Sequence, residues 1–254
     1  MMTNKAVIRA ENLSVAYGDF VLSRNLNFTV NENDVFIIMG GSGCGKSSLL
    51  KVLTGLMPPA AGKEIFYGVD FWNTPKNERS RLMRKAGILY QSGALWSSMT
   101  LGENIALPLR QYTNLSPFDI DEIVNLKLDL VGLNGFKDFY PSQISGGMKK
   151  RAGLARALAL DPQILFFDEP SAGLDPVSAK LLDDLIIEIK DSLNATIVIV
   201  THELASIFAI GTNSIFLDAT QKTATAGGNP KELLKNPPNE TVLRFLTRDE
   251  KRTL

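Results

Sequence analysis

The chain has 254 residues, 44% of them hydrophobic, which suffices for one large core with an added lobe but is short for a second full domain. Its 27 Lys plus Arg balance 27 Asp plus Glu, and the net charge of zero argues against the broad basic surface of a nucleic-acid-binding protein. The longest apolar runs are strand-sized, the N-terminus lacks the apolar stretch of a signal peptide, and one cysteine excludes an internal disulfide. We therefore expect no nucleic-acid partner and a reducing, cytosolic setting.

The sequence of the first part of the chain predicts a set of antiparallel β-strands, followed by a further strand, a loop and a helix. Residues 7–36 are expected to form antiparallel strands, with turns at Gly18-Asp19 and at residues 31–34. An apolar strand at residues 35–39 then runs into a glycine-rich loop and an apolar helix from Ser47 to about Leu56. This order of elements is that of a P-loop.

The middle of the chain predicts a helical lobe inserted into an α/β core. Between about residues 92 and 159 apolar residues recur at helical spacing. One such face consists of Ile120, Ile123, Val124, Leu128 and Val131. The alternation of strand and helix resumes with a strand at 164–167, a helix from Ser178 to about Leu193 and a strand at 196–200, as a parallel sheet requires.

The segment from Pro230 onward ends the chain with a short apolar patch and a charged run from Arg248 to Arg252. The patch consists of Val242, Leu243, Phe245 and Leu246. This tail is either a solvated end or an arm that docks a partner.

The glycine-rich loop matches the pattern GxxxxGK[ST] and lies between a buried strand and a helix, where its chemistry requires it. It consists of Gly40, Gly41, Ser42, Gly43, Cys44, Gly45, Lys46 and Ser47. Glycines let backbone N–H groups surround phosphate oxygens, Lys46 can meet the β and γ phosphates, and Ser47 offers a hydroxyl to Mg²⁺. Cys44 either fills space or, near a helix N-terminus, has a lowered thiol pKa and is reactive.

Acidic residues and the single histidine follow two of the predicted strands. Asp168 and Glu169 end the strand at 164–167, and we expect Asp168 to bind metal and Glu169 to polarise an attacking water. The alternative is an acidic pair that only ends a strand. His202 follows the strand at 196–200, so its ring is expected at the same sheet edge as Asp168, in contact with a γ-phosphate. The alternative for His202 is a structural role.

Ser145, Gly146 and Gly147 open a further helix, where small residues would let backbone amides approach an anion. An ordinary N-cap at Ser145 is the alternative. Three basic residues follow in the first turn, Lys149, Lys150 and Arg151. Because positive charge there opposes the helix dipole, a nearby anion explains them better than a solvated basic face.

Taken together, these motifs resemble the ATP-binding cassette (ABC) ATPases over nearly the whole chain. Walker A corresponds to residues 40–47, with Ser48 beside it, and Walker B ends at Asp168 with Glu169 adjacent. Tyr17 fits the aromatic that stacks on adenine, Gln91 the Q-loop glutamine that also reaches the metal, and His202 the switch histidine. The D-loop corresponds to Ser171, Ala172, Gly173, Leu174 and Asp175. The signature loop corresponds to Ser145, Gly146, Gly147 and Met148.

The signature departs from the common LSGGQ, because Ile144 replaces Leu and Met148 replaces Gln. Met148 cannot supply the hydrogen bonds of a Gln amide, but Ser145 and the two glycines are retained. We therefore expect phosphate recognition to survive the change.

The resemblance implies a RecA-like P-loop NTPase core with an antiparallel β subdomain and an inserted α-helical signature subdomain. Residues 1–91 and 160–230 would form the core with its β subdomain, 92–159 the helical subdomain and 231–254 the tail. ATP and Mg²⁺ would be bound and ATP hydrolysed. Two such subunits would pack head to tail as a homodimer, so that the signature loop of one covers the ATP held by the other.

Residues 90–96, 99–104 and 108–109 further resemble the ATPase subunits of MCE-type phospholipid transporters. That resemblance implies transmembrane permease subunits, an MCE lipid-binding subunit and a peripheral position on the cytoplasmic face of a bacterial inner membrane. Leu95, Trp96 and Leu101 would then line a groove for a permease helix, or else pack inside the helical lobe. The rivals are an ATPase for amino acids or lipoproteins and a soluble ATPase of Fe–S cluster assembly. DNA-repair and chromosome ATPases fit poorly, because the sequence has no long coiled-coil insertion and no cysteine-rich zinc site.

Overall fold

The computed structural model describes residues 5–248, which divide into two compact units. The first unit contains the described residues up to 83 and from 196 onward, and the second contains residues 84–195. Within residues 5–248, no helix combines the length and the apolar character that crossing a membrane requires.

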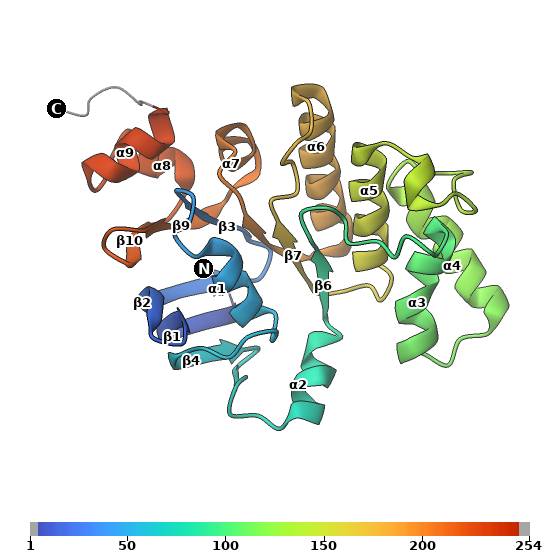
Figure 1. Ribbon diagram of the computed structural model, residues 1–254, viewed down its shortest axis with the longest axis horizontal. Helices are drawn as coiled ribbons and strands as arrows, with labels where there is room; N and C mark the ends of the chain where they lie inside the picture. Colours follow the sequence, from blue (N-terminus) through green and yellow to red (C-terminus); the bar gives the residue numbers. More distant parts are fainter. Residues whose placement is uncertain (1–4, 249–254) are drawn as a thin grey trace. The chain divides into compact units, whose positions relative to one another are not determined.

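The first unit contains an antiparallel sheet in the order β2-β1-β4-β5, of which Figure 1 labels β2, β1 and β4. Its strands are β1 (Ala6–Tyr17), β2 (Phe20–Asn31), β4 (Ala61–Phe66) and β5 (Val69–Asp70). The predicted turn at Gly18-Asp19 joins β1 to β2, and Gly18 takes the left-handed φ of 55° that glycine favours. Leu26, Phe28 and Val30 alternate with more exposed residues along β2, because only one face of this strand is buried.

The other strands of the first unit run in the order β10-β9-β3-β8. They are β3 (Val35–Gly40), β8 (Thr196–Val200), β9 (Asn213–Asp218) and β10 (Thr223–Gly227). β3 is buried along its whole length and is parallel to both β8 and β9, which explains its continuous apolar sequence. The predicted antiparallel segment therefore ends at Asn31 rather than at Phe36, because Val35 and Phe36 already belong to the parallel strand.

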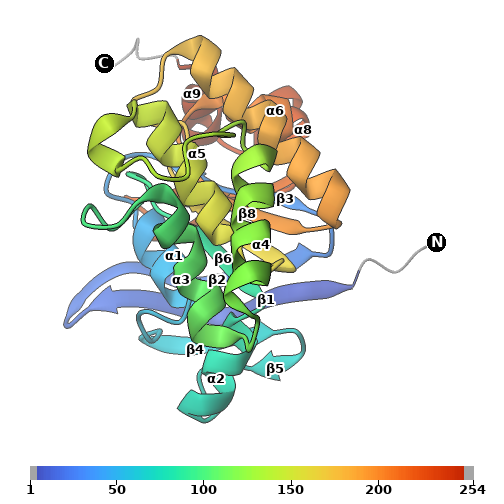
Figure 2. The same cartoon turned by 90° about the vertical axis from the view of Figure 1, so that its right-hand side faces the viewer.

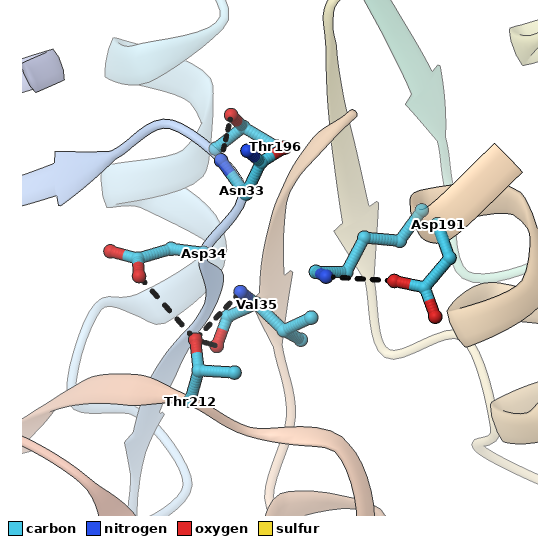
Figure 3. Close-up of polar contacts among 7 residues, drawn as sticks. Asn33, Asp34, Val35, Asp191, Thr196 and Thr212 are labelled. Carbon is cyan, nitrogen blue, oxygen red and sulfur yellow. Dashed lines mark hydrogen bonds and ion pairs between the residues drawn. The ribbon is translucent and has the colours of Figure 1, made fainter. Parts of the chain in front are cut away.

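Threonine hydroxyls accept hydrogen bonds from the first residue of β3 and from the turn just before it (Figure 3). The backbone N–H of Asn33 donates to Thr196 Oγ1 at 3.1 Å, and that of Val35 donates to Thr212 Oγ1 at 2.9 Å. Thr196 begins β8, and Thr212 directly precedes β9. The start of β3 is thus set relative to both flanking strands by side chains as well as by the sheet.

Helices of the first unit are α1 (Lys46–Leu53), α2 (Lys76–Met83), α7 (Leu204–Ile210), α8 (Pro230–Lys235) and α9 (Glu240–Thr247). α1 ends three residues before the predicted Leu56. The chain turns there at Gly55, with φ of 73°, where a Cβ would lie 2.9 Å from the ring of Phe71.

The tail is folded as far as Arg248. Val242 and Leu246 of α9 are buried, and the ring of Phe245 lies 5.1 Å from that of Phe216 in β9. Arg248 also donates to Glu203 at 3.1 Å. A solvated end is therefore wrong for residues up to 248, and the rest of the charged run lies outside the described residues. The docking arm stays a prediction.

The second unit combines two parallel strands (Figure 1) with four α-helices (Figure 2). These are β6 (Ala86–Leu89), β7 (Ile164–Asp168), α3 (Leu101–Tyr112), α4 (Pro117–Leu130), α5 (Gly146–Ala157) and α6 (Pro176–Leu193), with a 3-10 turn η1 (Pro141–Gln143). α3, α4 and α5 pack against one another. Capping boxes at Thr100 and Ser116 start α3 and α4, since both side chains accept from the backbone N–H three residues on.

Glu64 is a buried carboxyl group of the first unit that belongs to none of the predicted motifs. Glu64 in β4 is 0% exposed, and Trp72 Nε1 donates to its Oε2 at 2.9 Å. Oε1 has no hydrogen-bond partner among residues 5–248. Burial raises the pKa of Glu64 to about 8, against the smaller opposing effect of the Trp72 hydrogen bond, so this carboxyl is mostly protonated at neutral pH.

We expect Glu64→Gln to stabilise the protein at high pH. Between the ordinary glutamate pKa and about 8 the folded state holds a proton that the unfolded state has lost, so the stability of the wild type falls as pH rises through this window. Glutamine keeps the shape without the charge. The variant should gain on the order of a few kcal/mol at pH 8 and almost nothing near pH 4. Urea unfolding at several pH values measures this.

The exposed Glu188→Gln in α6 is the matched control and should leave stability unchanged at every pH. If the free energies of unfolding of wild type and Glu64→Gln changed with pH in the same way, Glu64 would ionise normally in the folded state, contrary to the prediction.

Candidate functional site

The Walker A loop lies between β3 and α1, and its path depends on glycine. Gly40, Gly43 and Gly45 have φ of 149°, 76° and 95°, values that L residues rarely adopt. At Gly40 a Cβ would also lie 2.4 Å from the carbonyl oxygen of Leu217. The loop can therefore bring its backbone close to a ligand, as the sequence predicts.

Lys46 lies across this loop, 9% exposed, with Nζ donating to the carbonyls of Gly40 at 2.9 Å and Gly41 at 3.0 Å. No side chain caps α1, whose N-cap is Gly45, and no acidic residue lies in its first turn. The helix start thus offers backbone donors and positive potential, with a positioned ammonium beside them. This combination suits a phosphate group.

Tyr17 lies at the end of β1, close to the first turn of α1. The Ser48 hydroxyl donates to the Tyr17 hydroxyl at 3.4 Å, and this hydrogen bond is the main cause that lowers the pKa of Tyr17. The ring is 49% exposed. A flat, exposed ring beside the phosphate loop can stack on a nucleotide base.

Cys44 is buried in the loop, 1% exposed, and burial raises the pKa of its thiol. The hypothesis of a reactive thiol is therefore wrong, because desolvation outweighs the favourable effect of Lys46. The interpretation as a space-filling residue fits, since Sγ lies 2.8 Å from where a Cβ of Gly40 would stand.

We expect the folded protein to react with a thiol reagent such as DTNB at least about a hundredfold more slowly than the unfolded chain, because Cys44 is both buried and protonated. Absorbance at neutral pH with and without denaturant measures the two rates. Equal rates would mean that Cys44 is open to solvent.

His202 lies two residues after the end of β8 and is exposed, with Nε2 3.8 Å from Glu203 Oε1. The ring is therefore accessible to a ligand, and its predicted contact with a γ-phosphate stays a prediction.

Asp168 is the last residue of β7 and Glu169 follows it, while Gln91 lies two residues after the end of β6. The two strands are paired in parallel, with Leu89 beside Phe167. This is the sheet edge at which α/β proteins bind ligands. Gln91 is exposed, Asp168 half-buried and Glu169 buried. Glu169 has φ of 49°, unusual for a residue other than glycine. The second unit thus brings three predicted site residues to one edge.

The residues predicted to bind Mg²⁺ are Ser47, Gln91 and Asp168, a hydroxyl, an amide oxygen and one carboxylate. Among residues 5–248 no group of three or more His, Cys, Asp or Glu forms a metal cluster. A hydroxyl, an amide oxygen and one carboxylate fit Mg²⁺, which binds through one or two carboxylates together with substrate phosphates and waters.

The signature loop begins α5. Ser145 is its N-cap, and Oγ accepts from the N–H of Met148 at 3.2 Å, so the capping interpretation is confirmed for the side chain. A Cβ on Gly147 would lie 3.7 Å from Leu174, which places the D-loop beside the signature. Both border a groove of about 310 Å³ that α6 also lines. Asp175 caps α6 by accepting from Val177 at 3.1 Å and Ser178 at 3.0 Å.

The explanation of the basic first turn of α5 by a nearby anion is wrong for two of its three residues. Lys150 Nζ donates to the carbonyl of Pro170 at 2.7 Å and to that of Ala172. Arg151 donates to Val131 at 3.1 Å and to the next carbonyl. These charges are directed at backbone carbonyls inside the unit.

Sequence reasoning missed Arg156, which donates to the carbonyls of Gly93 at 3.0 Å and Ala94 at 2.7 Å, just after Gln91. The same loop approaches α5 at Gly153, where a Cβ would lie 2.9 Å from Gly93. A glycine inside an otherwise regular helix was the available signal, since it marks a close approach.

The apolar residues proposed for a permease groove separate into two kinds. Leu101 is fully buried in α3 and belongs to the helical core, so it cannot line a groove. Trp96 is 59% exposed. Its loop is held by the buried Asn104, whose Oδ1 accepts from the Trp96 N–H at 2.7 Å and whose Nδ2 donates to three carbonyls, including that of Trp96 at 3.1 Å.

A buried parallel strand, a glycine loop and an uncapped helix that carries the lysine define a P-loop nucleotide-binding protein. The family model for the ABC transporter matches residues 23–172. Two relatives are the "Intermembrane phospholipid transport system ATP-binding protein MlaF" of Haemophilus influenzae and of Escherichia coli K12. The first is 38% identical, over 96% of this chain and 91% of its own length; the second is 36% identical, over 94% and 88%. The chain therefore belongs to the ABC transporter family, as one of its ATP-hydrolysing members.

A third relative is the "Probable ribonucleotide transport ATP-binding protein mkl" of Mycobacterium tuberculosis H37Rv, 40% identical over 94% of this chain and 66% of its own length. Among solved structures, cbiO1 of Clostridium perfringens has a TM-score of 0.83 with 26% identity and covers 97% of this chain and 96% of its own. A dimer of the ATP-binding cassette MJ0796 bound to ADP and Pi has a TM-score of 0.80 with 26% identity and covers 87% and 98%. The predicted P-loop NTPase fold is thereby confirmed.

Proposed function

We propose that the chain is the ATPase subunit of a transporter that moves phospholipid between two membranes. The observation that carries this is the similarity to two MlaF proteins along almost the full length of both. In this proposal the chain lies on the cytoplasmic face of the inner membrane and drives separate permease subunits, together with an MCE lipid-binding subunit.

Within the proposed site, Walker A and Ser48 hold the phosphates of ATP and Tyr17 stacks on adenine. Ser47, Gln91 and Asp168 bind Mg²⁺, which neutralises phosphate charge when bound. Glu169 accepts a proton from the attacking water, and the exposed His202 contacts the γ-phosphate. The uncapped start of α1 and the edge position of Glu169 support these roles.

We further propose a homodimer in which Ser145, Gly146, Gly147 and Met148 meet the ATP of the second subunit, next to the D-loop residues 171–175. The dimeric cassette among the related structures supports this. ATP would then favour the closed dimer through its γ-phosphate, and hydrolysis would remove that bias.

We expect Glu169→Gln to bind ATP with nearly unchanged affinity yet to hydrolyse it roughly a hundredfold or more slowly, because the amide cannot accept the proton from water. ATP should then trap this variant as a dimer in size-exclusion chromatography. Adding Ser145→Arg should abolish the dimer, since a long charged side chain would occupy the phosphate position at the start of α5.

Wild-type turnover by Glu169→Gln would contradict the role of Glu169. Dimers of the double variant would contradict a signature loop that acts on the partner's ATP.

Trp96→Ala should leave ATP hydrolysis by the isolated chain within about twofold of wild type while weakening recovery of membrane partners, because the exposed ring lies outside the core and is open to contact by a partner. Affinity purification after detergent extraction, followed by mass spectrometry, measures recovery. Tyr112→Ala, a second exposed aromatic of the same unit, is the matched control. Equal recovery of partners by Trp96→Ala and wild type would remove Trp96 from the interface.

The same purification tests the proposed function. A permease and a membrane-anchored MCE subunit would support lipid transport, whereas a soluble Fe–S scaffold alone would overturn it. The similarity to mkl makes ribonucleotide the competing cargo. The purified complex in vesicles should therefore transfer a fluorescent phospholipid in an ATP-dependent manner without accumulating labelled uridine monophosphate; the reverse result, or uptake of amino acids, would identify another transporter.

A further inference from the structure

Lys150 is a buried cation that the known motifs do not explain. It lies in α5, five residues after Ser145, and is 7% exposed. A buried ammonium must be paired with acceptors, because removing it from water is costly. Its partners are the carbonyls of Pro170 and Ala172, on either side of Ser171.

These carbonyls belong to the turn that directly follows Glu169. Within that turn the Ala172 N–H donates to the Glu169 carbonyl at 3.2 Å, and the Leu174 N–H donates to the Ser171 carbonyl at 3.1 Å. Glu169 itself has the left-handed φ of 49°, a conformation that persists only where surrounding contacts enforce it. Lys150, on the neighbouring helix α5, holds this turn by donating hydrogen bonds to two of its carbonyls.

The carboxylate of Glu169 is also close enough to act electrostatically on Lys150. Burial lowers the pKa of the Lys150 ammonium, and the negative charge of Glu169 works in the opposite direction. The Lys150 ammonium and the Glu169 carboxylate therefore attract each other.

We propose that Lys150 is a positioning residue for ATP hydrolysis, which holds Glu169 and the D-loop in place by donating to the carbonyls of Pro170 and Ala172. The inference rests on the proposed role of Glu169 as general base. Because Ser145 caps the same helix, Lys150 ties the loop that would meet the partner's ATP to the carboxylate that would activate water.

Lys150→Met removes the charge and all donors while keeping an unbranched chain. It should lower kcat at least about tenfold while the KM and Kd for ATP stay within about twofold, because the nucleotide is held by other residues. Lys150→Arg, which keeps charge and donors, should recover kcat to within roughly threefold of wild type. Lys180→Met, at an exposed lysine in α6 of the same unit, is the matched control and should behave as wild type.

The decisive measurement is the combination with Glu169→Gln. If Lys150 acts through Glu169, adding Lys150→Met to Glu169→Gln should lower kcat by no more than about twofold further, since neighbours that act as a unit are not additive. A packing role would instead multiply the two losses. Thermal melts identify any variant that does not fold. If Lys150→Met is one, Lys150→Leu, which also removes the charge and all donors, carries the same expectations.

Wild-type kcat for Lys150→Met, a parallel loss of ATP affinity, or multiplicative losses in the double variant would each overturn the inference. Rapid turnover by Glu169→Gln alone would overturn the role of Glu169 instead. The two failures are thus distinguishable within one set of proteins.

Discussion

The first unit depends on a backbone path that only glycine can follow. At Gly40 a side chain would collide with the Leu217 carbonyl of β9, so the end of β3 packs too closely against β9 for any residue with a Cβ. The opposite end of β3 is fixed by Thr196 and Thr212. The Ser23 hydroxyl of β2 donates to the Cys44 carbonyl at 3.4 Å, which adds a contact from the antiparallel sheet. A loop that binds phosphate through backbone donors must be held rigidly, and these contacts do so.

The second unit is organised around α5 in a comparable way. A Cβ on Gly87 of β6 would lie 2.2 Å from the Ala157 carbonyl at the end of this helix, and Gly153 and Gly93 meet near its centre. Arg156 and Lys150 add charged donors that satisfy carbonyls in the loops after β6 and β7. One helix therefore determines where the residues following both strands can lie.

Much of this could be predicted because it follows from local pattern. The strands at residues 164–167 and 196–200, the glycine loop and the helical stretch all follow from apolar periodicity and turn chemistry, which local sequence encodes. The failures concern long-range burial. Nothing near Cys44 in the sequence shows that its thiol would be buried. The basic residues Lys150 and Arg151 likewise give no sign that carbonyls twenty residues away would satisfy them. Glu64 was missed for the same reason, since a lone glutamate in a short strand gives no hint of a site closed off from water.

The contacts of Asn104 have a consequence for molecular recognition. Its side chain bonds four backbone groups of the loop from Trp96 to Thr100, so the indole is presented on a segment whose conformation is already fixed. A flexible loop loses roughly 1–2 kcal/mol of conformational freedom per residue when a partner orders it. The loop that carries Trp96 loses this entropy when the chain folds. A partner that binds Trp96 therefore does not have to order the loop, and more of the contact free energy contributes to affinity.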